Sequence, residues 1–207
     1  RDRLRSRGLG DVYKRQEQYK HVILITIDGM RGEMITDKEM PSPFLKNMKA
    51  NGTFIKKVTG ICPSSTYPSH TTIVTGALPS SHKIYYNSPF VENKDTTVSD
   101  WYADSIKVPT VWQAAKENGL TTASLFWPVS TKCDDIDYNI PEYWSVKRVS
   151  NQLDFIKPYC TPYGILEEIE EYAVGKLDHS NFGAGTLNRD AKTAYICLLY
   201  TSPSPRD

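Results

Sequence analysis

The chain has 207 residues, of which 39% are hydrophobic and 24% are charged, and its formal net charge at pH 7 is +1. This length is enough for one domain that buries a core of its own. No stretch approaches the ~20 consecutive apolar residues of a membrane span. Among the four cysteines there is no C-x-x-C pair, which excludes zinc-finger spacing, while a disulfide between Cys133 and Cys160 remains open.

The two ends of the chain differ from its middle. Residues 1–16 carry five Arg and one Lys without a helical or strand period, and residues 197–207 are rich in Pro and Ser. We interpret 1–16 as a non-native leader, 197–207 as a non-native tail and 17–196 as the native segment between them. A natural basic arm and a disordered tail are the alternative. Without the ends, 18 basic residues oppose 21 acidic ones, so no basic surface for a nucleic-acid polymer is expected.

The first expected element is a buried strand over residues 22–27, an apolar run that stops at Asp28. A helix that opens at the prolines 41 and 43 follows, with Phe44, Leu45 and Met48 on one face and Gly52 as its stop. The next expected segments are a short strand over 54–58, a helix over 69–75 and a long loop over 77–107.

The second half of the chain continues this alternation. Pro109 is expected at the first turn of a helix over 110–118, which Gly119 ends. The later expected segments are a strand over 121–126, a loop over 128–158, an amphipathic helix over 163–174 and the start of a helix over 188–196. Alternating strands and helices predict an α/β fold, a mostly parallel sheet flanked by helices.

Two residues next to these elements suggest chemistry. Asp28 follows the first expected strand, and ligands of open α/β sheets bind at the carboxyl ends of strands. Thr66 precedes a short helix, whose N-terminal amides favour a phosphate. A carboxylate for a metal and a hydroxyl that faces an anion indicate metal-assisted phosphoryl transfer. A turn-capping Asp and a helix-capping Thr are the structural alternatives.

Several short segments resemble, in the same order, the nucleotide pyrophosphatase/phosphodiesterase family of the alkaline phosphatase superfamily. The matching segments are 27–31 (IDGMR), 66–76 (TYPSHTTIVTG), 79–82 (PSSH), Asn87 and 109–128. The resemblance extends over about residues 20 to 196. It implies an alkaline-phosphatase-like α/β domain that is incomplete at its C-terminal side, so the chain would be the N-terminal half of a catalytic domain.

The resemblance also implies roles for individual residues. Asp28 would bind one of two zinc ions, and Thr66 would be a metal-bound nucleophile that forms a covalent phospho-threonine intermediate. Asn87 would donate an N–H to a phosphoryl oxygen, although a loop Asn is often only a turn residue. Tyr67 would stack on a nucleobase, with packing on Pro68 as the alternative. The remaining zinc ligands are expected in a C-terminal half outside this chain.

The histidines are expected to contribute little to the metal site. His70 and His82 occupy positions that are not metal ligands in the resembling family, and we interpret both as structural. The pair Asp178-His179 resembles a metal-binding pair, but it follows no apolar strand and is better explained as a solvated loop.

The expected activity is therefore zinc-dependent hydrolysis of phosphodiester or pyrophosphate bonds in small, nucleotide-type substrates, with this chain alone inactive. A phosphomonoesterase or phosphonoacetate-type hydrolase of the same superfamily is an alternative, and so is a non-catalytic phosphate-binding module. A sulfatase is disfavoured because the residues before Thr66 lack the Cys/Ser-x-Pro-x-Arg pattern. The family implies a periplasmic or extracellular location, which the residues themselves leave undecided.

Overall fold

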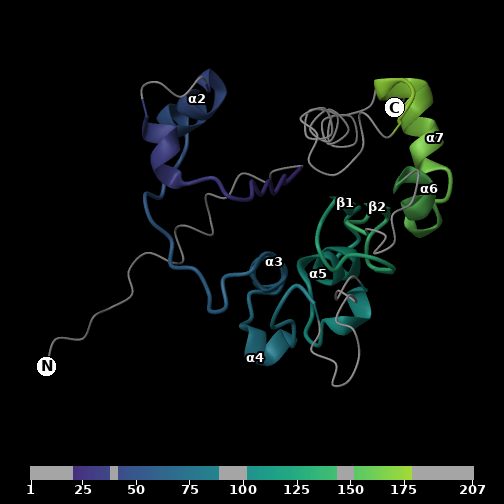
Figure 1. The fold of residues 1–207 in the computed structure, drawn as a ribbon, viewed down its shortest axis with the longest axis horizontal. Helices are drawn as coiled ribbons and strands as arrows, with labels where there is room; N and C mark the ends of the chain where they lie inside the picture. The colour runs from purple at the N-terminus through teal and green to yellow at the C-terminus, as the bar shows by residue number, and fades with distance from the viewer. Residues whose placement is uncertain (1–20, 38–41, 89–101, 144–151, 179–207) are drawn as a thin grey trace, which may run out of the picture.

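The computed structural model describes residues 21–37, 42–88, 102–143 and 152–178 (Figure 1). The helix expected over 188–196 and both chain ends lie outside these ranges. No helix within them is long and apolar enough to cross a membrane. The elements are, in chain order, η1 (Gly32–Thr36), α2 (Pro43–Asn51), α3 (Thr66–Thr75), α4 (Pro79–His82), η2 (Ala103–Ser105), α5 (Val111–Glu117), β1 (Ala123–Leu125), β2 (Tyr138–Ile140), α6 (Gln152–Ile156), η3 (Lys157–Tyr159), α7 (Ile165–Ile169) and the π-helical turn η4 (Glu170–Val174).

The apolar run over 22–27 is not a strand, which corrects the first sequence-based prediction. Its side chains are exposed, Val22 at 89% and Ile25 at 70%. The expected strand over 54–58 is also absent, and Val58 is 80% exposed. A strand exists only when a neighbour pairs with its backbone N–H and C=O groups. Within the described ranges the sheet consists of β1 and β2 alone, so neither apolar run has a strand beside it.

Helix α2 confirms the helix that was expected before Gly52. It ends at Asn51, and the Gly52 amide donates to the Met48 carbonyl at 2.8 Å. The expected buried face is wrong, because Phe44 is 69% and Met48 52% exposed. Helix α2 contacts η1, and in Figure 1 it lies away from α3, α4 and α5.

Helix α3 is the element that joins two parts of the core. It begins at Thr66, three residues before the expected start. Tyr67, Thr71 and Val74 follow the i, i+4, i+7 spacing of one helix face and are all buried. Tyr67 packs in one cluster with Ile84 and Val129. Val74 packs in another with Trp112 of α5 and Trp127, which follows β1. Gly76 ends the helix with φ +64°, a left-handed conformation that favours glycine.

Helix α5 and the two strands form the α/β part of the fold. The helix begins after Thr110, whose hydroxyl accepts from the Gln113 amide at 3.3 Å, so Thr110 and not Pro109 sets its start. Strands β1 and β2 are parallel, with Ser124 opposite Asn139. Strand β2 lies inside the segment that the sequence predicted as a loop. Helices with a parallel strand pair agree with the predicted α/β class.

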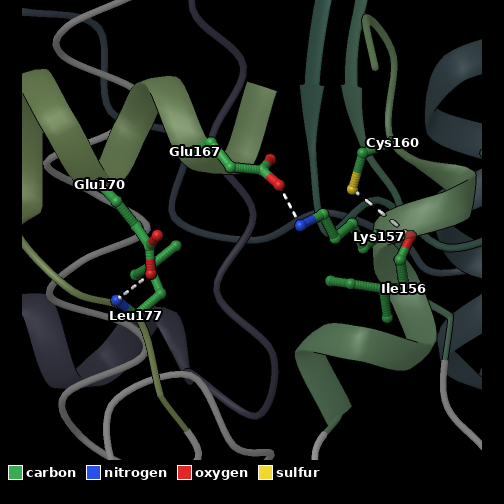
Figure 2. Close-up of polar contacts among 6 residues, drawn as sticks. All are labelled: Ile156, Lys157, Cys160, Glu167, Glu170 and Leu177. Atoms are coloured by element: carbon green, nitrogen blue, oxygen red, sulfur yellow. Dashed lines mark hydrogen bonds and ion pairs between the residues drawn. The ribbon is translucent and has the colours of Figure 1, made fainter. Parts of the chain in front are cut away.

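The C-terminal helices pack against β2 through the largest core cluster. Its buried members are Ile140, Leu153, Ile156, Cys160, Ile165, Leu166, Ile169 and Leu177. Figure 2 shows the polar contacts around it: a Lys157–Glu167 ion pair, and Glu170 Oε1 accepting from the Leu177 amide at 2.6 Å. The predicted helix over 163–174 is confirmed with Ile165 and Ile169 inward, but Tyr172 is 61% exposed. The ion pair is solvent-accessible and contributes little beside the apolar packing.

Truncation of Ile169 to Ala is expected to lower the free energy of unfolding by about 2–5 kcal/mol, because a side chain that is 1% exposed would leave a cavity. Urea unfolding of the complete protein that carries this chain measures the change. The control is Glu171→Ala, two residues further on and exposed, for which we expect little change. Equal effects of the two variants would contradict this packing.

Candidate functional site

Thr66 is the first residue of α3 and is half-buried. Ser65 precedes it in extended conformation (φ −75°, ψ 159°) and does not cap the helix with its side chain. The first amides of a helix have no partner within the helix and carry the positive end of its dipole. The Thr66 hydroxyl therefore belongs to a helix end that attracts an anion.

Asn87 contacts Tyr67, the residue after Thr66, although the two are 20 positions apart in the chain. The Tyr67 amide donates a hydrogen bond to Asn87 Oδ1 at 2.9 Å. Because only the carbonyl oxygen of an Asn side chain accepts, this bond sets the amide orientation and leaves Nδ2 as the donor. Two of the sequence-predicted site residues are thus brought together by a direct contact at the start of α3.

Tyr67, the predicted stacking residue, is only 6% exposed. Its ring packs with Ile84 and Val129, and its hydroxyl lies 3.4 Å from Glu142 Oε1. The structure shows Tyr67 packed in the core, as in the alternative that the sequence left open. The neighbours are Ile84 and Val129. Base stacking by Tyr67 stays a prediction.

Asp28 is exposed and begins a turn. Its Oδ1 accepts from the Gly29 amide at 3.0 Å, and Gly29 has φ +68°, a left-handed conformation. Both features match the turn-capping alternative for this Asp. They do not conflict with a metal role, because a carboxylate that accepts one N–H keeps its second oxygen and its charge.

His70 connects the segment of Asp28 to the start of α3. Its Nδ1 lies 2.8 Å from the Thr66 carbonyl oxygen, and its Nε2 lies 3.1 Å from Thr26 Oγ1. The ring meets Trp127 edge-on, with centroids 5.1 Å apart. Sequence reasoning missed this link, although the i, i+4 spacing of Thr66 and His70 was a signal for a contact across one helical turn.

His82 is fully buried and holds α3 to the segment after α4. Its Nδ1 accepts from the Ile84 amide at 3.1 Å, so Nε2 carries the proton and donates to Thr72 Oγ1 at 3.0 Å. Burial lowers the pKa of His82 because the charged ring would lose its hydration. These contacts confirm the structural role expected for this histidine.

The sequence model of the type I phosphodiesterase / nucleotide pyrophosphatase family matches residues 22–187, which include every site residue described above. The chain belongs to this family. The resemblance that the sequence motifs indicated is thereby confirmed.

Individual relatives point the same way. The chain is similar to human ectonucleotide pyrophosphatase/phosphodiesterase family member 1, at 30% identity over 56% of this chain and 13% of the relative. It is 32% identical to the rat family member 3 over 53% of this chain and 13% of the relative. It is 28% identical to the venom phosphodiesterase CdcPDE of Crotalus durissus collilineatus over 66% of this chain and 18% of the relative. The matched region is therefore less than a fifth of these relatives.

Within the described ranges, no three His, Cys, Asp or Glu side chains lie close enough together to hold a metal ion. Asp28 supplies one carboxylate near the phosphodiesterase motif, and Asp178 is exposed while His179 lies outside the described residues. Cys133 and Cys160 are not disulfide-bonded. Burial raises the pKa of Cys160 to about 12, so that thiol is protonated at neutral pH. Oxygen ligands such as Asp28 and the Thr66 hydroxyl fit part of a zinc site.

The His82 environment predicts a pH-dependent stability. The unfolded chain binds a proton near pH 6.5, the ordinary histidine pKa, whereas the native ring remains neutral to a lower pH. The neutral His82 therefore contributes fully to the free energy of unfolding above about pH 6.5. This contribution is lost as the pH falls from there through the lowered native pKa. Thermal unfolding of the complete protein between pH 5 and 8 measures this slope. His82→Gln should flatten it and the exposed His21→Gln should not; a slope that is unchanged in His82→Gln would contradict the assignment.

Proposed function

We propose that the protein carrying this chain hydrolyses phosphodiester or pyrophosphate bonds of small, nucleotide-type substrates, with Thr66 as the nucleophile. The observation that supports this most directly is the contact at the start of α3, where Asn87 binds the amide next to Thr66 at 2.9 Å. It joins a hydroxyl, an amide donor and a helix N-terminus in a chain whose family is named for these activities.

In the proposed reaction Thr66 Oγ1 attacks phosphorus in line with the leaving oxygen. The new O–P bond forms as the bond to the leaving group breaks and the hydroxyl proton is released to solvent, so the intermediate is a phospho-threonine that still carries the substrate's other ester substituent. Asn87 Nδ2 donates to a non-bridging oxygen, and the positive end of α3 stabilises the charge that develops there. Water then attacks the same phosphorus and releases Thr66.

A threonine hydroxyl is a weak nucleophile at neutral pH and needs activation. Asp28 and Thr66 would each contribute an oxygen ligand to a two-zinc site. Zinc bound there supplies Lewis-acid stabilisation and lowers the pKa of a bound hydroxyl. In Asp28 one oxygen caps the Gly29 turn, so the other is the atom offered to a cation.

The proposal extends to the rest of the domain. The parallel strand pair and the family membership support an alkaline-phosphatase-like arrangement, in which further ligands come from residues other than those described. "Ectonucleotide" and "venom" in the names of the relatives support a location outside the cytoplasm. If Tyr67 stacks on the base, its ring must become more accessible than the 6% that is exposed here.

Thr66→Ala in the complete enzyme should lower kcat/KM for bis-p-nitrophenyl phosphate by about 10³-fold or more, because the attacking oxygen is removed. Thr66→Ser should retain measurable activity, since it keeps a hydroxyl. The control is Thr75→Ala at the other end of the same helix, which should leave the rate near that of the wild type. Mass spectrometry of acid-quenched enzyme should find the transferred phosphoryl group on Thr66. An unchanged rate in Thr66→Ala would exclude the nucleophile assignment.

The 207-residue chain alone is expected to bind zinc weakly and to turn over little substrate. A two-zinc site needs about six protein ligands, and no three His, Cys, Asp or Glu side chains of the described residues lie close enough together to hold an ion. Isothermal titration with ZnCl₂ tests this, with Asp28→Asn as the comparison. Two tight sites that disappear in Asp28→Asn would show that the chain holds a complete metal centre and would contradict the expectation.

A further inference from the structure

We propose that His70 is a positioning residue, which holds the Asp28 segment against the first turn of α3 by bridging Thr26 and Thr66. The inference rests on the proposed function, because it assigns His70 a role in aligning the groups that would carry the reaction. It goes beyond packing, since the two ring nitrogens contact two segments that are 40 residues apart in the chain.

The hydrogen-bond directions follow from the partners. A carbonyl oxygen only accepts, so Nδ1 carries the proton and donates to Thr66 O at 2.8 Å. In the neutral ring Nε2 is then an acceptor, and Thr26 Oγ1 donates to it at 3.1 Å. The same ring therefore satisfies a backbone carbonyl of the nucleophile residue and a side chain of the distant segment.

Packing holds the ring in this orientation. The edge-on contact with Trp127 has an interplanar angle of 76°, a favourable geometry for aromatic pairs. Trp127 is only 8% exposed and meets Trp112 edge-on at 6.0 Å. Val74, on the same helix as His70, belongs to this cluster. The His70 ring is thus held by its hydrogen bond to the Thr66 carbonyl and by its contact with Trp127.

This bridge limits where Asp28 can lie. Only Ile27 separates Thr26 from Asp28, so their Cα atoms are at most about 7 Å apart. The Asp28–Gly29 turn is closed by its own hydrogen bond, which restricts the carboxylate further. The apolar residues before it are exposed and pair with no strand in the described chain, so the Thr26–His70 bond is an important anchor for this segment. A displacement of about 1 Å at a reacting group can cost 10²-fold in rate.

A double-mutant cycle in the complete enzyme tests the bridge. Thr26→Val removes the hydroxyl with little change in shape, and His70→Asn keeps a donor for Thr66 O but is too short for Thr26. Each should lower kcat for bis-p-nitrophenyl phosphate about 10- to 100-fold with KM little changed, because Asn87 and the α3 amides are untouched. The double variant should be no slower than the slower single one. Thr26→Ser, which keeps the hydroxyl, should restore the wild-type rate.

A second readout does not depend on activity. Hydrogen exchange of a peptide spanning residues 21–31, followed by mass spectrometry on the zinc-free enzyme, should be faster in both single variants and normal in Thr26→Ser. Wild-type kcat and wild-type exchange in Thr26→Val would overturn the proposal, and so would losses that add in the double variant. Thr66→Ala is measured in parallel. If it keeps its rate, the nucleophile assignment fails, while the exchange data still decide whether His70 anchors the Asp28 segment.

Discussion

The hydrogen bond from the Tyr67 amide to Asn87 is the interaction on which the site depends. Ser65 does not cap α3 with its side chain, so the helix end is completed by a residue from beyond α4. Asn87 can take this position because the buried His82, which precedes it by five residues, is hydrogen-bonded to Thr72 and Ile84. These bonds hold the chain after α4 against α3. A structural hydrogen-bond network thereby places the amide group that the proposed reaction uses.

Helix α3 packs into two apolar clusters, which fixes the position of its first turn. Tyr67 enters one apolar cluster and Val74 another, and Trp127 belongs to the second. Proposed catalytic groups are most effective when they stand on elements whose orientation packing already fixes. The burial of Tyr67 is part of this arrangement. The Tyr67 ring, for which the family resemblance implied a substrate contact, packs here against Ile84 and Val129 and fixes the helix that begins at Thr66.

Local signals in the sequence predicted α2, α3, α5 and α7, but they missed α4 and α6, which lie in segments predicted as loops, and they predicted only β1 of the two strands. Gly52, Gly76 and Gly119 mark helix ends because these signals act within one turn. The run over 22–27 carries the composition of a buried strand, yet a strand forms only with a partner, which composition does not supply. For the site, the motifs pointed to Tyr67 and Asn87, which are in direct contact, whereas the His70 bridge depends on how two distant segments approach.

The described part of the chain leaves two kinds of group without their usual surroundings. The apolar run over 22–27 is exposed, and several polar atoms are buried without a hydrogen-bond partner among the described residues. Thr71 Oγ1, Ser124 Oγ and Trp127 Nε1 are buried without a hydrogen-bond partner in the described part of the chain. Such groups are rare in folded proteins because each costs about 1–3 kcal/mol. Two of them belong to the α3 face and to the tryptophan against which His70 packs. A polar partner from outside the described residues, polypeptide or solvent, would remove the cost of each of these unsatisfied atoms.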